Sequence, residues 1–186
     1  MKRDLRPLRD KLRADKRCAR LLTLFHELPM YQLDADSLIK EIEQIHKARS
    51  VRFLTQSSPR FIEAVVDASL MDQANRSRLA EISMACYKAE STLNEALVPL
   101  KSYLLLTYSA DFSGVRTKEE RLQIINMALR PFTRFLDRIT KTKTMASMVI
   151  DDIDKAHWTL RGHIEAMKLK SGRGYRDWKQ IGRAHV

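Results

Sequence analysis

Apolar residues recur alternately three and four positions apart through residues 117–170. Twelve of the fourteen positions in this stripe are apolar, the exceptions being Lys143 and His157. An alternation of this length places all fourteen side chains along one side of a helix and predicts a partner helix lying along it. The stripe is Leu122, Ile125, Leu129, Phe132, Leu136, Ile139, Lys143, Ala146, Ile150, Ile153, His157, Leu160, Ile164 and Met167.

Start and stop signals bound this long element. Thr117, with Glu120 three residues later, matches a capping box and predicts the first turn. Ser171-Gly172 suits the end, because glycine readily adopts the left-handed conformation that closes many helices. Pro131 removes one helical hydrogen bond, so we expect a kink there.

A second stripe with the same rhythm precedes it and supplies the partner. Pro59 suits the first turn of that helix, and the segment 109–115 supplies the turn between the two arms. The sequence therefore predicts an antiparallel hairpin with arms near 59–109 and 117–170. The partner stripe is Leu79, Ile82, Cys86, Ala89, Leu93, Ala96, Leu100 and Tyr103.

Folding the chain back at this turn brings together residues whose numbers add up to about 230. Pro99 then faces Pro131, so both arms should kink at one level. Lys143 falls opposite Cys86 and Ala89, whose small side chains leave room for its aliphatic stem.

In the same register, His157 falls opposite Asp72 and Asn75, which occupy seam positions of their own arm. A histidine beside a carboxylate can serve catalysis. No nucleophile, glycine-rich loop or metal motif accompanies this pair, so the polar layer is interpreted as a device that fixes register.

Two shorter helices are expected before the hairpin. The first runs to about Leu28 and carries a dense set of basic residues; the second spans about Ser37 to Leu54, capped by Asp36 or Ser37. Eight of the nine early basic residues fall within an arc of roughly 140° on the first helix, Lys11 being the exception. The nine are Lys2, Arg3, Arg6, Arg9, Lys11, Arg13, Lys16, Arg17 and Arg20.

The fold class is therefore all-α: a long kinked antiparallel helical hairpin with two shorter N-terminal helices packed on it. Residues 1–58 form the basic N-terminal helix pair, 59–172 the hairpin and 173–186 a basic aromatic tail. Residues 181–186, Ile-Gly-Arg-Ala-His-Val, match the translation of a common sequencing-library adapter. They are left out of the fold argument.

The chain of 186 residues has a formal net charge of +11. The basic arc has three interpretations: a solvated face, a phosphate-binding surface, or a membrane-surface helix, the last having only a thin insertion face of Leu and Ala. The candidate nucleic-acid-binding residues on this arc are Arg3, Arg6, Arg9, Arg13, Lys16, Arg17 and Arg20.

The tail interleaves basic and aromatic residues that suit phosphate contact and base stacking. A disordered tail without a ligand is the other interpretation. The candidate residues here are Arg173, Tyr175, Arg176, Trp178 and Lys179.

No arrangement of residues typical of a catalytic site, metal site or cofactor site is visible in the sequence, so we expect that the protein is not an enzyme. Without a signal peptide or a long apolar segment, we expect a cytoplasmic protein with no membrane partner. Cys18 and Cys86 are expected to be reduced thiols.

Two stretches resemble a known family. Residues 150–158 (IDDIDKAHW) leading to 164–172 (IEAMKLKSG) resemble the closing helix of phage recombination mediators of the UvsY kind, and residues 75–108 look like that family's long helix. The resemblance implies a helical, oligomeric protein that binds single-stranded DNA and helps load a recombinase. It covers about half of the chain and assigns no functional residue.

Two functions follow as hypotheses. The first is a non-catalytic nucleic-acid-binding accessory protein that holds the phosphates of a single strand. The alternative is a helical structural or adaptor protein whose hairpin binds a protein partner or a second copy of itself.

Overall fold

The computed structural model describes residues 6–50, 61–115 and 117–181, with the backbone alone described for residues 50, 61–63, 163–164 and 166–181. Within these residues the protein consists of helices, with no strand, so the predicted all-α class is confirmed. The elements are α1 (Arg6–Arg13), α2 (Lys16–Glu27), the short 3-10 helix η1 (Pro29–Tyr31), α3 (Ala35–Ser50), α4 (Phe61–Thr107), α5 (Lys118–Ala128) and α6 (Arg130–Ile181).

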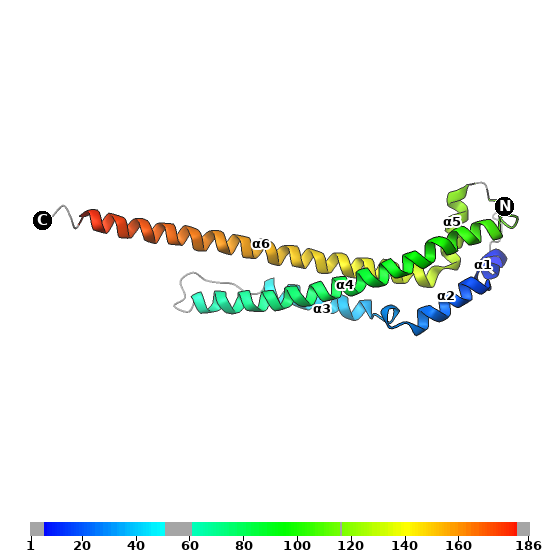
Figure 1. Cartoon of the computed structure of the whole chain (residues 1–186), viewed down its shortest axis with the longest axis horizontal. Helices are drawn as coiled ribbons and strands as arrows, with labels where there is room; N and C mark the ends of the chain where they lie inside the picture. The colour runs from blue at the N-terminus through cyan, green and yellow to red at the C-terminus, as the bar shows by residue number, and fades with distance from the viewer. Residues whose placement is uncertain (1–5, 51–60, 116, 182–186) are drawn as a thin grey trace.

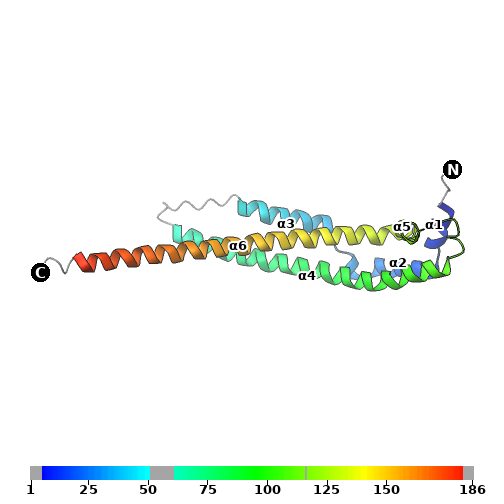
Figure 2. The same cartoon turned by 90° about the horizontal axis from the view of Figure 1, so that it is seen from above.

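The long helices α4 and α6 form the predicted antiparallel hairpin, and α3 lies along its side (Figures 1 and 2). The two stripes face each other as expected, because Leu79, Leu93, Ile139 and Ile153 are almost completely buried. Burying two matched apolar stripes supplies most of the stability of such helices, since isolated helices are marginal in water.

The buried residues form two clusters along the long axis. We call the first part the stem: α3 with residues 61–92 of α4 and 137–162 of α6, whose core includes Ile42, Ile82 and Ala146. We call the second part the tip: α1, α2, η1, the turn 108–115 and α5 around residues 93–107 of α4 and 130–136 of α6, with a core that includes Phe112. In Figure 1 the tip lies at the right, where α5 stands steeply across the long helices.

Aromatic rings connect the N-terminal segment to the start of α6. The ring centre of Phe25, on α2, lies 5.2 Å from those of Phe132, Phe135 and Tyr31. Aromatic pairs at these separations add to the burial of their apolar surface. The predicted packing of the N-terminal segment on the hairpin is therefore confirmed, and α2 is placed beside the first turns of α6.

The long second arm differs from its prediction. The capping box of Thr117 and Glu120 is present, but the chain leaves the helix at Leu129 and restarts at Arg130. Pro131 thus lies in the first turn of α6, where its missing N–H costs nothing, so a break replaces the predicted kink. The predicted end near residue 170 is also wrong, because α6 continues through Gly172 to Ile181.

The opposite arm stays helical from Phe61 to Thr107, with Pro99 inside it. The predicted start at residue 59 lies outside the described residues. The long helices therefore respond differently to their prolines: α4 accommodates Pro99 within a continuous helix, whereas the second arm breaks before Pro131.

The expected single N-terminal helix is two helices. Asp15 takes an extended backbone conformation (φ −58°, ψ 136°), and its carboxylate accepts a hydrogen bond from the backbone N–H of Arg17 at 2.8 Å. This is the N-cap geometry that aspartate favours. The chain therefore ends α1 at Arg13 and begins α2 at Lys16.

The following helix begins earlier than predicted. Asp34, and neither Asp36 nor Ser37, supplies the cap of α3, because its carboxylate accepts the Ser37 N–H at 3.1 Å. The helix is described as far as Ser50, and the predicted continuation to Leu54 lies outside the described residues.

Candidate functional site

Arg13 of the predicted basic arc holds α1 against α5. Its side chain donates hydrogen bonds to the carbonyl oxygens of Ala128 at 3.2 Å and Met127 at 3.4 Å. The last carbonyls of a helix lack intrahelical partners and carry partial negative charge, so a guanidinium suits them. This arginine therefore stabilises the tip.

Other members of the arc are also engaged within the tip. The Arg17 guanidinium lies 3.8 Å from the ring centre of Tyr103, and the Arg9 guanidinium is 3.1 Å from the Asp10 carboxylate. Together with the break at Asp15, these contacts show that the early basic residues do not form one continuous arc on one helix. Arg3 lies outside the described residues, and Arg6 is exposed on α1.

Lys16 and Arg20 remain exposed on α2 and make no hydrogen bond or ion pair within the described part of the chain. A second basic row, which the sequence analysis missed, starts α6. Its spacing of four, four and three residues puts it on one side of the helix. The row is Arg130, Arg134, Arg138 and Lys141, all exposed.

This second row lies on a helix next to the one that carries Lys16 and Arg20. The Phe25 contacts with Phe132 and Phe135 bring α2 beside the start of α6. Of the four residues, Arg138 alone has a described ion-pair partner, Asp36 at 3.4 Å, and both side chains are exposed. Counting basic residues within helix faces other than the N-terminal one would have found this row.

A polar cluster pins the junction between α1 and α2. The Asp15 carboxylate accepts hydrogen bonds from the Tyr108 hydroxyl at 2.9 Å and the Tyr103 hydroxyl at 3.3 Å. Burial alone would raise the pKa of Asp15, but the hydrogen bonds from Arg17 N–H and the two tyrosines lower it overall. The carboxylate is thus ionised at neutral pH and anchors the junction.

The same junction affects its neighbours. Burial, followed by the hydrogen bond to Asp15 and its negative charge, raises the pKa of Tyr108 to about 12. Burial, followed by the charge of Asp15, raises the pKa of the Cys18 thiol to about 11. Both groups stay protonated at neutral pH, so Cys18 is a buried structural thiol and a poor nucleophile.

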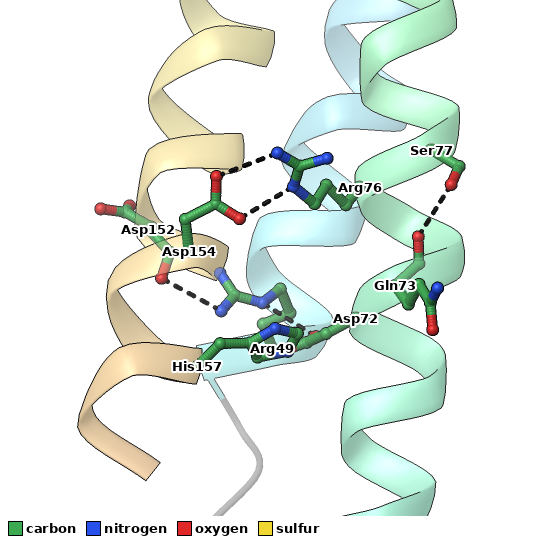
Figure 3. A network of polar contacts seen from close by, with 8 residues as sticks. All are labelled: Arg49, Asp72, Gln73, Arg76, Ser77, Asp152, Asp154 and His157. Atoms are coloured by element: carbon green, nitrogen blue, oxygen red, sulfur yellow. Dashed lines mark hydrogen bonds and ion pairs between the residues drawn. The ribbon is translucent and has the colours of Figure 1, made fainter. Parts of the chain in front are cut away.

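The predicted polar layer of the stem includes Asp72 and His157, and also Arg49, which was not expected (Figure 3). The Arg49 side chain, at the end of α3, reaches between the long helices and donates to the Asp72 carboxylate at 3.0 Å. It also donates to the carbonyl oxygen of Asp152 at 3.4 Å. One guanidinium therefore ties all three helices of the stem together.

His157 faces Asp72 as predicted, but its Nε2 lies 3.9 Å from the carboxylate, which is too far for a hydrogen bond. One turn away, Arg76 pairs with Asp154 at 2.8 Å. The Asp72 carboxylate is already held by Arg49, and within the described part of the chain the Nε2 atom of His157 has no hydrogen-bond partner. This arrangement is consistent with a layer that fixes the position of three helices.

Lys143 lies at the predicted level, near Cys86. The sequence analysis did not foresee its partner, Glu90, whose carboxylate pairs with the ammonium group and also accepts a hydrogen bond from Thr140 at 3.1 Å. The hydrogen bond from Lys143, against the effect of burial, lowers the pKa of Glu90. This pair joins α4 to α6 midway along the stem.

The tail candidates belong to α6, because the helix runs to Ile181. The side chains of Arg173, Tyr175, Arg176, Trp178 and Lys179 lie outside the described part of the chain, as do residues 182–186. The interpretation of these positions as an irregular tail is therefore corrected for 173–181, while their contact with nucleic acid stays a prediction.

Across the part of the chain that the structure describes, no group of three or more His, Cys, Asp or Glu side chains could hold a metal ion. In the same residues no helix combines the length and the apolarity that crossing a membrane requires. Cys18 and Cys86 are free thiols, both buried. Comparison of the chain with protein-family models, with curated proteins and with solved structures gives no match.

Proposed function

We propose that this protein is a non-catalytic accessory protein that binds a single strand of nucleic acid with its tip. The observation that carries the proposal is that two adjacent helices, α2 and α6, both carry exposed basic side chains without a described partner. Lys16 and Arg20 lie on α2, Arg130 and Arg134 lie on the neighbouring first turns of α6, and Lys141 continues the row of α6 into the stem. A flexible polyanion can meet several of these charges at once.

The stem differs from the tip in how its basic residues are used. Four of them are held by carboxylates across the helix contacts: Arg49 by Asp72, Arg76 by Asp154, Arg78 by Glu41 and Lys143 by Glu90. A phosphate would have to displace a carboxylate from each of these four residues, whereas at the basic residues of α2 and α6 named above it replaces only water and counterions. Binding at the tip should therefore depend strongly on salt and little on base sequence.

A triple variant tests the proposal. Changing Lys16, Arg20 and Arg134 together to Gln removes three charges without touching a described hydrogen bond or ion pair, and Gln keeps the helices. We expect weaker binding of single-stranded DNA of any sequence. The slope of log K against log salt should flatten by roughly 2, because each phosphate that a basic residue no longer neutralises lowers it by about 0.7.

The matched control is Lys40→Gln, Lys88→Gln and Lys155→Gln, which removes three exposed charges from the stem without touching a described side-chain hydrogen bond or ion pair. It should bind nearly as tightly as the parent protein. Absence of DNA and RNA binding by the parent at low salt, or equally weakened binding in both triple variants, would refute the proposal.

A role as a recombination mediator is a narrower form of this proposal and is supported only by the resemblance of residues 75–108 and 150–172 to that family. It adds the expectation that single-stranded DNA outcompetes a duplex of the same length for the protein. A preference for duplex would remove the narrower role and leave general nucleic-acid binding in place.

The second candidate function, a helical adaptor, is favoured by a different observation. The exposed side of α4 carries a long row of uncharged residues, several of them large and apolar. Rows of this kind are used for contacts between proteins.

A further inference from the structure

The side of α4 that faces away from the core carries its own alternation of three and four residues. None of its ten positions is charged, although 31% of the chain is. Its five large apolar members are between half and two-thirds exposed. The row, which we call the outer stripe, is Val66, Leu70, Gln73, Ser77, Ala80, Met84, Tyr87, Ser91, Asn94 and Val98.

The outer stripe borders an open groove between α4 and α6. The groove has a volume of about 580 Å³, and small side chains such as Ala80, Ser83 and Ser147 line it. Lys143 lies 5.8 Å from the ring centre of Tyr87 at its edge. Small residues along a groove let another helix approach closely, so this face has the shape of an unfilled position in a helical bundle.

We propose that a second copy of this chain fills the position, with its α4 antiparallel to the first across a twofold axis between Ala80 and Met84. The proposal is independent of nucleic-acid binding, because the outer stripe lies chiefly on the stem. An isologous contact requires a surface that complements itself. The outer stripe meets this requirement when residues whose numbers add up to 164 face each other.

In this register most of the large side chains meet small or matching ones, and Leu70 meets the uncharged Asn94. Ala80 faces Met84 of the other copy, and Ser77 faces Tyr87. Further along, the paired positions are Gln73 with Ser91, Leu70 with Asn94 and Val66 with Val98. Alternation of large and small residues across facing positions allows two helices to interdigitate without voids.

The charges beside the stripe agree with the same register. Arg76 comes level with Glu90 of the other copy, within about two residues along the axis, or roughly 3 Å. Within its own chain Arg76 is held by Asp154, and Glu90 is held by Lys143. The contact between Arg76 of one copy and Glu90 of the other therefore joins two existing ion pairs, with the basic residue of one next to the acidic residue of the other. Glu81 is bound by its own Arg78 at 3.2 Å, which offsets the approach of its copy near the axis.

The net charge of the chain explains why the antiparallel arrangement is preferred. Two chains of +11 repel each other, and most exposed unpaired basic groups described above lie at the tip. Antiparallel pairing puts the two tips at opposite ends, so that their α4 segments lie roughly 30 to 75 Å from their copies at 1.5 Å per residue. These distances are several times the Debye length of about 8 Å at physiological salt.

The size of the surface sets the expected affinity. The outer stripe is about 50 Å long, and a helix about 10 Å wide gives it a footprint of roughly 500 Å² per copy before the α6 wall is added. Stable interfaces commonly bury about 800 Å² per partner. We therefore expect a reversible dimer whose population depends on protein concentration.

Sedimentation of the full chain tests the interface. The parent protein should shift from monomer to dimer between low and high micromolar concentration, and Met84→Glu should remain monomeric over that range. Met148→Glu is the matched control, because Met148 is similarly exposed but lies on α6 beside α3. Helical content should be equal in all three proteins, since neither methionine is buried.

Cross-linking tests the register. Ser83 lies next to its own copy across the axis, so Ser83→Cys should yield covalent dimers with a short thiol cross-linker, while the buried Cys18 and Cys86 do not react. The two Ser77 positions are about 15 Å apart along the axis, and Ser77→Cys should not cross-link. A parent protein that stays monomeric, a dimer unaffected by Met84→Glu, or equal cross-linking at both positions would overturn the proposal.

Discussion

Replacing Asp15 by Ala should loosen the tip while leaving the stem folded. The change removes the cap of α2 and the acceptor for the hydroxyls of Tyr103 and Tyr108. Loss of an N-cap costs about 1 kcal/mol, and a hydrogen bond from a hydroxyl to a carboxylate contributes about 1 to 2 kcal/mol. The 3.3 Å bond is the weaker one, so a destabilisation of about 2 to 3 kcal/mol is expected.

Asp15→Asn separates these contributions. Asparagine caps helices as well as aspartate does, and its amide oxygen can accept one hydroxyl, so its cost should be about 1 kcal/mol or less. Both variants keep the buried apolar clusters intact. The difference in destabilisation between Asp15→Ala and Asp15→Asn therefore measures the interactions of the side chain at position 15 and not a change in apolar packing.

Hydrogen exchange read peptide by peptide is the suitable assay, because the stem and the tip have separate cores. In Asp15→Ala the amides of α2 and α5 should exchange roughly 30- to 100-fold faster, which corresponds to about 2 to 3 kcal/mol, while those around Ile82 and Ala146 change little. Equal exchange in the parent and Asp15→Ala, or an equal increase in the alanine and asparagine variants, would refute the reasoning.

Two further predictions concern charged groups. Arg49→Gln should destabilise the stem by about 2 to 4 kcal/mol in urea unfolding, because it leaves the buried Asp72 carboxylate without its guanidinium partner. The double variant Arg49→Met with Asp72→Leu should recover most of that stability, because it removes both buried charges. A double variant less stable than Arg49→Gln would contradict this prediction. The second prediction concerns the dependence of stability on pH. Because the pKa of Tyr108 is raised, its contribution to the stability of the tip is complete below about pH 10 and is lost as the pH rises towards 12. Because the pKa of Asp15 is lowered, its contribution to that stability is lost only as the pH falls below about 4. Tyrosinate absorbance and tip exchange should change together at the alkaline end, and titration of all tyrosines near pH 10 would disprove this link.

The hairpin was predictable because the residues buried between two long helices recur in the sequence at regular spacings of three and four. Residues such as Leu79 and Ile153 repeat with a spacing that only a paired helix explains, and the register that they define also placed His157 beside Asp72. The capping box at Thr117 was predictable for a similar reason, since both partners lie within one turn. Local spacing and long periodicity are therefore sufficient for the main architecture.

The errors arose where tertiary contacts decide between local alternatives. Asp15 reads equally well as a surface charge within one helix or as a cap, and the hydroxyls of Tyr103 and Tyr108, almost a hundred residues away, favour the cap. Arg49 was missed because nothing in the sequence gives the register of α3 against the hairpin. The basic row at the start of α6 does not stand out in the sequence, because its residues alternate with those of the apolar stripe on the opposite side of the same helix.

The docking of α1 and α2 on the turn end of the hairpin has a consequence for how the chain reaches its native state. Lys11 pairs with Asp111 at 2.8 Å, one hundred residues further along the chain. At a synthesis rate of about 5 to 20 residues per second, the segment around Asp111 on which α1 docks is made several seconds or longer after α1 itself. The loop between these residues also carries a closure entropy that grows with its length. Assembly of the tip should therefore be a late step, with a nascent N-terminus that spends this interval as an unpaired basic segment.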